Sequence, residues 1–267
     1  MINILRKTRK SFKVDFLALY CILLFIFLLS PIVIIVLFSF NASRAGSFPM
    51  AGLSIKWYLE VIKSAAFISA VKNSVYVAIS TSFFSVLIGT LASFGLTRYS
   101  FKFKNVVKLL VLLPITIPPL LIGISLLSYF NIIKIPLSLL TVTISHLVFC
   151  IPFVILVMNS RLEGFNFSIE EAAKDLGANG LQTFRYVTFP IMRPSLIGVA
   201  MLAFALSFDE FLITFFTIGT DNTLPLVIWA MLRRGISPSV NAISTLVLIV
   251  SMFFILAANK IARLKLL

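Results

Sequence analysis

Apolar runs of about 20 residues recur along this chain, and short polar segments separate them. A helix of that length crosses the hydrocarbon core of a bilayer, which is roughly 30 Å thick. Hydrophobic residues make up 60% of the 267-residue sequence and charged residues only 12%, a balance that excludes an ordinary soluble domain. We therefore predict an all-α membrane protein. Its six predicted transmembrane helices cover Phe16–Phe40, Phe67–Leu96, Val106–Phe130, Leu137–Ser160, Pro194–Ile218 and Val240–Ala258.

The predicted organisation is one membrane domain with short basic ends. Residues 1–15 form a basic N-terminus, residues 16–258 hold the six spans, and residues 259–267 form the C-terminus. The first apolar run is about 25 residues long, against about 7 to 15 in the apolar part of a signal peptide, so we expect it to remain as a span. Within the membrane domain, residues 161–193 form one long polar loop.

The basic residues that give the chain a formal net charge of +14 are distributed as a membrane topology would predict. If both termini are cytoplasmic, most of the 23 Lys and Arg residues lie on the cytoplasmic side, which is the positive-inside pattern of membrane proteins. The charge therefore predicts a multi-pass protein with both ends in the cytoplasm, and it does not call for a nucleic-acid partner.

The sequence contains no motif for chemistry of its own. Cys21 and Cys150 lie inside apolar runs, where a small buried thiol is usual, and His146 has no neighbouring ligands that would complete a metal site. No glycine-rich phosphate loop of the GxxxxGK[ST] type is present, so ATP-driven work would need another chain. We predict a protein that is not an enzyme and that holds neither a metal nor a cofactor.

Two segments between the spans have helical patterns. In LSIKWYLEVIKSAAF, Ile55, Tyr58, Leu59 and Ile62 share helical spacing, which indicates a helix at the membrane edge. A ligand contact at Trp57 or Tyr58 is the alternative. The segment TLPLVIWAMLRRGISPS holds an apolar stretch too short to span, and we predict a short re-entrant or gating helix there.

Several prolines fall within the predicted spans. They are Pro31, Pro114, Pro118, Pro119 and Pro152. Each lacks a backbone donor, so it either kinks a helix that lines a cavity or is simply tolerated, as prolines often are in membrane helices. The sequence leaves both interpretations open.

The polar loop contains a segment, SIEEAAKDLGANG, whose pattern predicts a short helix. Ser168 followed by Glu171 matches a capping box, so the helix is predicted to begin at Ile169. Gly177 is the natural left-handed stop. The predicted apolar stripe consists of Ile169, Ala172, Ala173 and Leu176, and the polar ring around it consists of Glu170, Glu171, Lys174 and Asp175.

A second helical stretch is predicted after the turn Asn179-Gly180, and Pro190 and Pro194 are expected to limit it. Two short helices with a small-residue face and a polar ring suit docking into the cleft of a partner protein. The alternative is a solvated loop that folds back on its own bundle, and the residues alone favour neither.

At these residues the sequence resembles the signature loop of ABC-transporter permeases. That signature is EAA, three residues, Gly, nine residues, then I-x-L-P. Here it stands as Glu171-Ala172-Ala173, then Gly177, then VTFP ending at Pro190, with two apolar replacements. The resemblance implies a type I importer permease bundle, also called MetI-like. It also implies a loop that couples the permease to an ATPase subunit through Glu171, Ala172, Ala173, Asp175, Gly177 and Pro190.

Two adjacent carboxylates, Asp209 and Glu210, lie within the fifth predicted span. An acidic group at the bilayer centre costs roughly 2.5 to 3.5 kcal/mol, so such groups usually face a bundle interior or water. They either meet a cation descending from outside, pair with Arg233 or Arg234, or reach water at a helix end. Adjacent residues point to different faces of a helix, which argues against an intramembrane enzyme.

A second resemblance covers most of the chain, from about Phe38 to Ser251. SRLEGF, EAAKDLGAN, LSFDEFLITFFTIG and LPLVIWAMLRRGISPSVNAIST look like the second permease of spermidine/putrescine ABC importers. The resemblance implies that Ser207, Asp209 and Glu210 contribute to the polyamine path. The third span has only PITIPPLLIG and no acidic residue, so a site that uses a carboxylate there would have to differ.

The resemblance also implies the surroundings of the chain. It implies a second permease subunit, two cytoplasmic ABC ATPase subunits that bind ATP and Mg, an extracytoplasmic polyamine-binding protein, and the bacterial inner membrane. Permeases for other solutes such as iron or thiamine share the coupling loop and remain alternatives. A secondary transporter driven by an ion gradient is the alternative from another class, although no internal repeat is visible in the sequence.

Overall fold

The computed structural model describes residues 16–44, 49–235 and 237–263, and the chain is mostly helical within them. The described residues form no β-strand, only an isolated antiparallel bridge between Asn41 and Leu53. The helices are α1 (Phe16–Ser39), α2 (Lys56–Lys63), α3 (Ala65–Arg98), α4 (Lys104–Leu112), α5 (Pro119–Ile132), α6 (Leu139–Glu163), α7 (Ser168–Asp175), α8 (Gly180–Thr183), α9 (Phe189–Phe208), α10 (Leu212–Thr217), α11 (Leu224–Arg233) and α12 (Pro238–Arg263).

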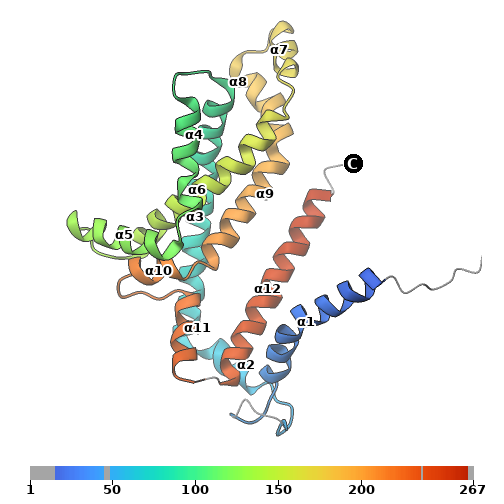
Figure 1. The fold of residues 1–267 in the computed structure, drawn as a ribbon, viewed down its shortest axis with the longest axis vertical. Helices are drawn as coiled ribbons and strands as arrows, with labels where there is room; N and C mark the ends of the chain where they lie inside the picture. The colour runs from blue at the N-terminus through green and yellow to red at the C-terminus, as the bar shows by residue number, and fades with distance from the viewer. Residues whose placement is uncertain (1–15, 45–48, 236, 264–267) are drawn as a thin grey trace, which may run out of the picture.

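Helices α3, α6 and α9 pack against one another and hold the main core (Figure 1). On α6, Cys150, Val154 and Met158 recur every four residues and are fully buried. On α3, a Cβ at Gly89 would lie 2.6 Å from Val154 Cγ1, so only glycine allows this close approach. Small residues at such contacts are the usual way in which membrane helices come close together.

Four described helical runs are long and apolar enough to cross a membrane: Phe16–Ser39, Ala65–Arg98, Leu139–Glu163 and Gly180–Phe208. The bent pair α4 and α5 makes a fifth if it is counted as one span. Helix α12 has 26 residues, and its described apolar part is Pro238–Met252. The all-helical membrane architecture is therefore confirmed, while the number of six spans stays a prediction.

Helix α1 stands apart from the main core. It packs along α12 near the end marked by α2 and extends away from α3, α6 and α9 (Figure 1). The most apolar 18-residue window of α1 has no buried residue. Cys21 on α1 is accordingly exposed, so the expectation of a buried thiol there is wrong, whereas Cys150 is buried as expected.

Helix α2 (Lys56–Lys63) confirms the helix predicted in this segment, and the structure adds which of its residues are buried. The predicted apolar stripe is exposed at Ile55, Leu59 and Ile62, and the buried residues are Trp57 and Val61. The reason is that lipid solvates an apolar face as well as a protein core does, so helical periodicity does not indicate which apolar face is inside. The Trp57 indole N–H donates to the carbonyl oxygen of Asn41, 2.7 Å away.

The third predicted span is not one continuous helix. Helix α4 ends in a 3-10 turn at Leu113–Ile115, and α5 begins at Pro119 after a bend of 99°. Pro118 has an extended backbone, with φ −54° and ψ 134°. A residue that precedes proline is driven out of the helical region, and neither proline has a backbone donor, so two consecutive prolines break the span.

The fifth helical run begins earlier than predicted and passes through both prolines. It starts at Gly180, widens into a π turn at Phe184–Thr188 and continues as α9. Pro190 lies in the first turn of α9, where the missing N–H matters least, and Pro194 lies inside the helix. The prediction that these prolines limit the helix is therefore wrong.

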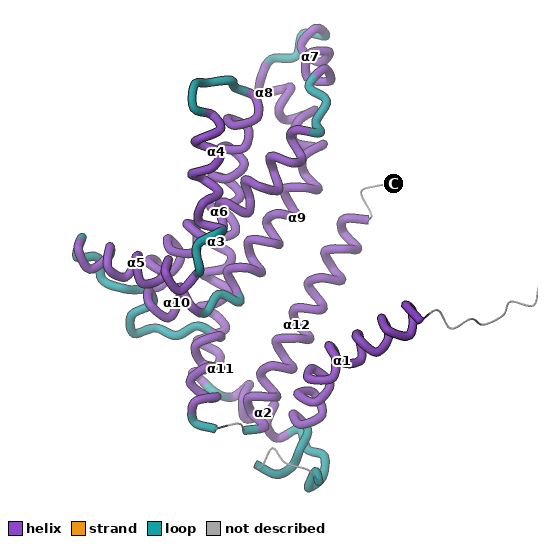
Figure 2. Tube along the Cα trace, in the orientation of Figure 1, coloured by secondary structure: helices purple, strands orange, loops and turns teal. Residues whose placement is uncertain are grey.

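The same run stops at Phe208, inside the span that was predicted to continue to Ile218. Residues 209–211 leave the helix, and α10 follows as a separate short element. Figure 2 shows irregular segments of this kind at mid-height of the bundle, below α4 and below α9.

The two broken spans meet through α5 and α10, which pack against each other. At Gly123 on α5, a Cβ would lie 3.2 Å from both the Ile213 Cα and the Leu212 carbonyl oxygen. A larger residue would push the two short helices apart. Glycine at this position is therefore what lets the segments that follow the two breaks lie side by side.

Candidate functional site

Helix α7 lies at one end of the bundle, next to α8, and presents an open surface (Figure 1). Ile169 is 44% exposed and Leu176 is 90% exposed, and Glu171 and Ala172 are exposed as well. Of the predicted apolar stripe, only Ala173 is partly covered. The stripe is thus not packed against the chain's own bundle, which argues against the folded-back alternative.

The helix begins by a different device from the predicted capping box. It starts at Ser168, one residue earlier than predicted, and the side chain of Asn166 accepts hydrogen bonds from the Ser168 backbone N–H at 3.1 Å and from its hydroxyl at 2.7 Å. Glu171 takes no part in this cap. Its side chain is exposed.

The predicted stop at Gly177 is confirmed. Gly177 has φ +91°, a left-handed conformation that favours glycine. The Ala178 N–H donates to the Ala173 carbonyl at 3.0 Å, and the Gly177 N–H donates to the Lys174 carbonyl at 2.8 Å. These two bonds make a Schellman motif, which ends the helix and turns the chain sharply.

Asn179 begins the next helix directly, where a free turn was predicted. Its side chain accepts from the Gln182 backbone N–H at 2.9 Å, and the Gln182 side chain accepts from the Asn179 backbone N–H at 2.8 Å. This reciprocal pair is a capping box. The helix stop at Gly177 and the helix start at Asn179 are therefore two residues apart, so the loop is stiff.

Glu170 ties the loop to the bundle, although the sequence pattern placed it in the exposed polar ring. It is only 4% exposed and forms an ion pair with Arg98 at the end of α3. The same carboxylate oxygen accepts from the Thr188 hydroxyl at 2.6 Å. The Arg98 guanidinium also lies 5.0 Å from the ring centre of Phe94 and 5.1 Å from that of Phe167. The loop is thus joined to α3 and to the π turn before α9.

Sequence reasoning had no signal for this contact. Arg98 and Glu170 are 72 positions apart, far beyond the reach of any helical spacing. A neighbouring ion pair, Lys108 with Glu163 at 3.3 Å, links α4 to α6 but is much more exposed. Because one pair is buried and the other open, only the first is expected to contribute strongly to stability.

The break after α9 contains the two carboxylates singled out in the sequence. Asp209 forms the C-cap of α9 and is exposed, whereas Glu210 is half-buried. One Glu210 carboxylate oxygen accepts from the Ile213 backbone N–H at 3.0 Å. Neither carboxylate is in the ion pairs of the described residues, so the arrangement matches the helix-end alternative and not a pair with Arg233 or Arg234.

Ser207 lies in the last turn of α9, two residues before Asp209, and is buried, at 4% exposure. Its hydroxyl is 2.8 Å from His146 Nδ1, and the other ring nitrogen of His146 is 2.9 Å from the Thr214 hydroxyl. The structure thus brings Ser207 together with two residues that sequence reasoning did not assign to any site. A lone histidine inside an apolar run was the available signal, because such a residue needs polar partners. Among the described residues no group of metal-ligating side chains includes it.

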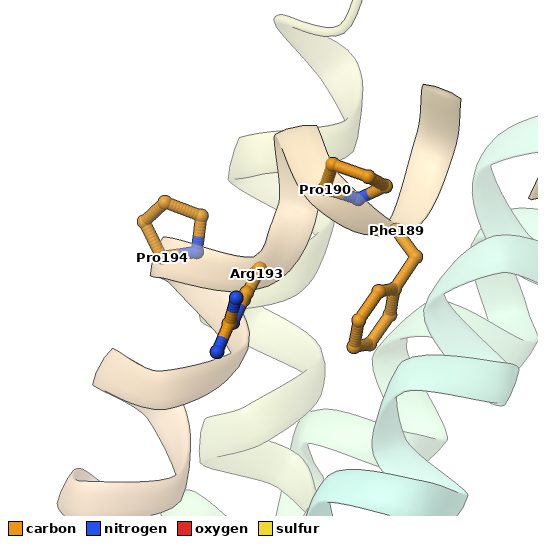
Figure 3. A pocket seen from close by; sticks show the side chains of 4 residues that line it. All are labelled: Phe189, Pro190, Arg193 and Pro194. Carbon is orange, nitrogen blue, oxygen red and sulfur yellow. The ribbon is translucent and has the colours of Figure 1, made fainter. Parts of the chain in front are cut away.

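A hollow with a volume of about 390 Å³ opens at the start of α9. Phe189, Pro190, Arg193 and Pro194 line it, and Figure 3 shows Phe189 and Pro194 on opposite sides of the helix. All four residues come from the first turns of one helix, so this is a surface feature and not an enclosed chamber. Among the residues predicted for function it includes only Pro190.

A bundle of apolar helices that carries an open, stiff loop at one end and two broken spans at mid-height is the architecture of a transport permease. The chain belongs to the family described as binding-protein-dependent transport system inner membrane component, whose pattern matches residues 85–265. It is therefore a permease subunit of an ABC importer.

Individual relatives are similar over nearly the whole chain. The spermidine/putrescine transport system permease protein PotC of Escherichia coli (strain K12) is 35% identical over 241 residues, 90% of this chain and 91% of that protein. The putrescine transport system permease protein PotI of the same organism is 35% identical over 232 residues, 84% and 82% of the two chains. A sulfate transport system permease protein, CysT of Salmonella typhimurium, is 28% identical over 226 residues.

Solved structures support the fold. A bacterial ABC transporter that imports alginate matches with a TM-score of 0.71 at 18% identity, covering 92% of this chain and 95% of that chain. The MetNI methionine ABC transporter, in an inward-facing conformation, matches with a TM-score of 0.59 at 17% identity, covering 76% and 99%. The predicted MetI-like architecture therefore has direct structural counterparts.

Proposed function

We propose that this permease carries polyamines of the spermidine and putrescine class. The observation that carries the proposal is the 35% identity to PotC of Escherichia coli, which extends over 90% of the chain. The exposed Asp209 carboxylate at the break after α9 supports it, because a polyamine has several positive charges that anionic groups along its path attract.

The complete transporter would contain other chains. We propose six spans with both termini in the cytoplasm. The contact between Arg98 and Glu170 brings residues 98–108 and 161–193 to the same end of the bundle, and both segments carry arginines and lysines. Loops rich in these residues favour the cytoplasmic side. A second permease, two ATPase subunits that bind ATP and Mg, and an extracytoplasmic polyamine-binding protein would complete the assembly. The permease itself would supply the path and no hydrolytic chemistry.

The α7 loop would be the element that the ATPase moves. Its exposed side chains Glu171 and Leu176 are available to a partner, and the Gly177 stop gives the loop one defined shape. Glu170 would pass the movement on, because it contacts both α3 and the π turn before α9. Alternating access of this kind needs states of similar energy, whose balance ATP binding shifts.

The coupling role is tested by Glu171→Gln in the complete complex. Because Glu171 is exposed, the folded complex is expected to keep its stability while uptake per ATP hydrolysed falls. Unchanged uptake and unchanged coupling would overturn the assignment of Glu171, and uptake that continues without ATP would favour a gradient-driven carrier.

Within the path, the three predicted residues would have different roles. Asp209 is free to meet a cation, whereas one oxygen of Glu210 is already engaged with the Ile213 N–H. Ser207 is buried, and its hydroxyl is engaged with His146. We therefore propose Asp209 as the main contact of the cationic substrate.

The substrate assignment is tested by ATP-driven uptake into vesicles that contain the complete complex. Labelled spermidine and putrescine are compared with sulfate, which is the substrate named for one of the relatives. Saturable, ATP-dependent uptake of a polyamine is expected. Uptake of another solute without polyamine uptake would overturn the substrate and leave the class of transporter in place.

A further inference from the structure

His146 lies in α6 and links this helix to both sides of the break in the fifth helical run. Its Nδ1 is 2.8 Å from the Ser207 hydroxyl in the last turn of α9, and its Nε2 is 2.9 Å from the Thr214 hydroxyl in α10. The side chain is 1% exposed. A polar ring held so deeply within a membrane bundle is costly to keep, which directs attention to what its two bonds hold.

The hydrogen-bond partners determine the roles of the two ring nitrogens. Thr214 has a single hydroxyl hydrogen, and its Oγ1 donates to the carbonyl oxygen of Glu210 at 2.8 Å. Thr214 Oγ1 must therefore accept from His146, so Nε2 carries the proton. In the neutral ring Nδ1 is then an acceptor, and Ser207 donates its only hydroxyl hydrogen to it. The polar groups of this cluster are all used internally.

The cluster brackets the two carboxylates. Ser207 precedes Asp209 by two residues, and Thr214 holds the backbone of Glu210 directly. The Glu210 carboxylate in turn accepts from the Ile213 N–H, within the same short helix. A shift of α10 relative to α9 would therefore change the direction of both carboxylates at once.

A second polar contact runs between α6 and α10. The Thr141 hydroxyl on α6 lies 2.7 Å from the Thr217 carbonyl oxygen at the end of α10 and equally 2.7 Å from the Ser138 carbonyl oxygen, so the two acceptors share its one hydrogen. Thr141 therefore contacts the far end of α10, where α5 also packs against this helix, whereas His146 bonds to the end next to the break. Of these contacts, the two bonds of His146 are the ones that join α9 and α10 across the break.

We propose that His146 is a positioning residue of the translocation path: by holding Ser207 and Thr214 it sets the geometry of the break, and thereby the separation and direction of the Asp209 and Glu210 carboxylates. The inference rests on the proposed function, because the carboxylates matter only if they meet a cationic substrate. Ser207 then acts through His146 and not by touching the substrate. The spacing of the two carboxylates would select among cations that differ in the spacing of their charges.

The test compares His146→Leu and His146→Gln with Thr143→Val in the complete transporter. Thr143 is a matched control, because it is buried in α6 and its hydroxyl donates to the Leu139 carbonyl of the same helix, at 2.8 Å, with no bond to another helix among the described residues. The measured quantity is the ratio of spermidine to putrescine uptake. The binding protein and the ATPase are the same in every sample, so a changed ratio belongs to the permease.

His146→Leu is expected to change that ratio by about five-fold, the weight of one net hydrogen bond. His146→Gln is expected to restore part of it, because an amide offers one acceptor and donors on a side chain of similar reach. Thr143→Val is expected to leave the ratio unchanged. If His146→Leu lowers both uptake rates equally, the residue serves only general folding and the proposal is overturned.

A second measurement does not depend on the substrate. In a background of Cys21→Ser and Cys150→Ala, the rate at which a cationic thiol reagent modifies Asp209→Cys reports the exposure of that position. His146→Leu is expected to change the rate by about five-fold, and Thr143→Val is not. An unchanged rate overturns the positioning role even if polyamines are transported. A changed rate, together with no polyamine uptake by the transporter that keeps Asp209, upholds the positioning role and overturns the proposed substrate.

Discussion

The two polar clusters of this permease use different chemistry to hold the same helical run. At the loop end, Glu170 meets Arg98 in an ion pair, and the Arg98 side chain is 33% exposed. At the mid-height break, His146 holds Ser207 and Thr214 by hydrogen bonds between groups that need carry no charge. A full charge is tolerable where water is near and expensive where it is not, so position along the bundle explains the choice.

The two clusters also differ in the mechanical role for which their contacts suit them. The loop cluster joins α7 to α3 and to the start of α9, so it is suited to passing on a movement. The break cluster holds α9 and α10 in a fixed relation, so it is suited to keeping a geometry. The first is expected to be sensitive to loss of charge, and the second to loss of hydrogen-bond direction.

The largest expected effect is on the loop cluster. Glu170→Leu leaves Arg98 and the Thr188 hydroxyl without their partner. We expect a loss of about 3 kcal/mol in the free energy of unfolding, the lower end of the range for a broken buried pair because Arg98 is partly exposed. Thermal or denaturant unfolding of the purified complex measures it.

The exposed pair of Lys108 and Glu163 provides the control. Their side chains are 32% and 61% exposed, so Glu163→Leu is expected to cost less than about 1 kcal/mol. Equal losses from Glu170→Leu and Glu163→Leu would show that burial does not distinguish the two pairs.

The next effect concerns the carboxylates at the break. Asp209→Asn removes an exposed charge, and it breaks no side-chain hydrogen bond within the described part of the chain. We expect polyamine uptake to fall by about ten-fold, as suits the loss of one charge contact at short range, with unchanged stability. Initial uptake rates at saturating ATP measure it.

Glu210→Gln is the matched variant, because the side-chain amide oxygen of the introduced glutamine can still accept from the Ile213 N–H. A smaller loss than that of Asp209→Asn is expected. A larger loss would reverse the proposed roles of the two carboxylates.

The smallest expected effect is that of the helix stop. Gly177→Ala puts a side chain on a left-handed residue with φ +91°, although no atom would lie within 4 Å of the added Cβ. The backbone strain alone is expected to cost about 1 kcal/mol and to lower uptake through a misdirected loop. Uptake and unfolding are measured on the same preparation.

Gly198→Ala is the control for this change. It also has open space around its Cβ position but lies in α9 with an ordinary helical backbone, so a neutral or slightly stabilising effect is expected. Equal losses at the two glycines would contradict the strain argument.

Much of the architecture was predictable because it depends on neighbouring residues. Three long apolar helices lie close to their predicted limits, and α7 ends at Gly177 as expected, since both features follow from short-range backbone rules. The predictions were wrong where an alternative local device existed: Ser168 is the first residue of α7 and bonds to the Asn166 side chain instead of capping the helix, and a π turn precedes Pro190 in a continuous helical run.

Other features depended on which face of a helix turned inward. On α2, Trp57 is buried and Leu59 is exposed, although both are apolar residues of one helix. Lipid and protein core are equally apolar, so hydrophobicity does not separate the two faces. The most apolar 18-residue window of α1, which has no buried residue, has the same explanation.

The amino-acid sequence by itself determined that this protein is a helical membrane protein, where three of its long helices run, and that the helix in the polar loop stops at Gly177. These properties arise from hydropathy and from contacts within a few residues, and the resemblance of the loop to the permease signature added the class of protein. Only the tertiary structure decided that Glu170 anchors the loop to Arg98 and that His146 spans the break between Ser207 and Thr214. Such pairs join residues 61 to 72 positions apart, and the helix packing that brings them together is set by the whole bundle.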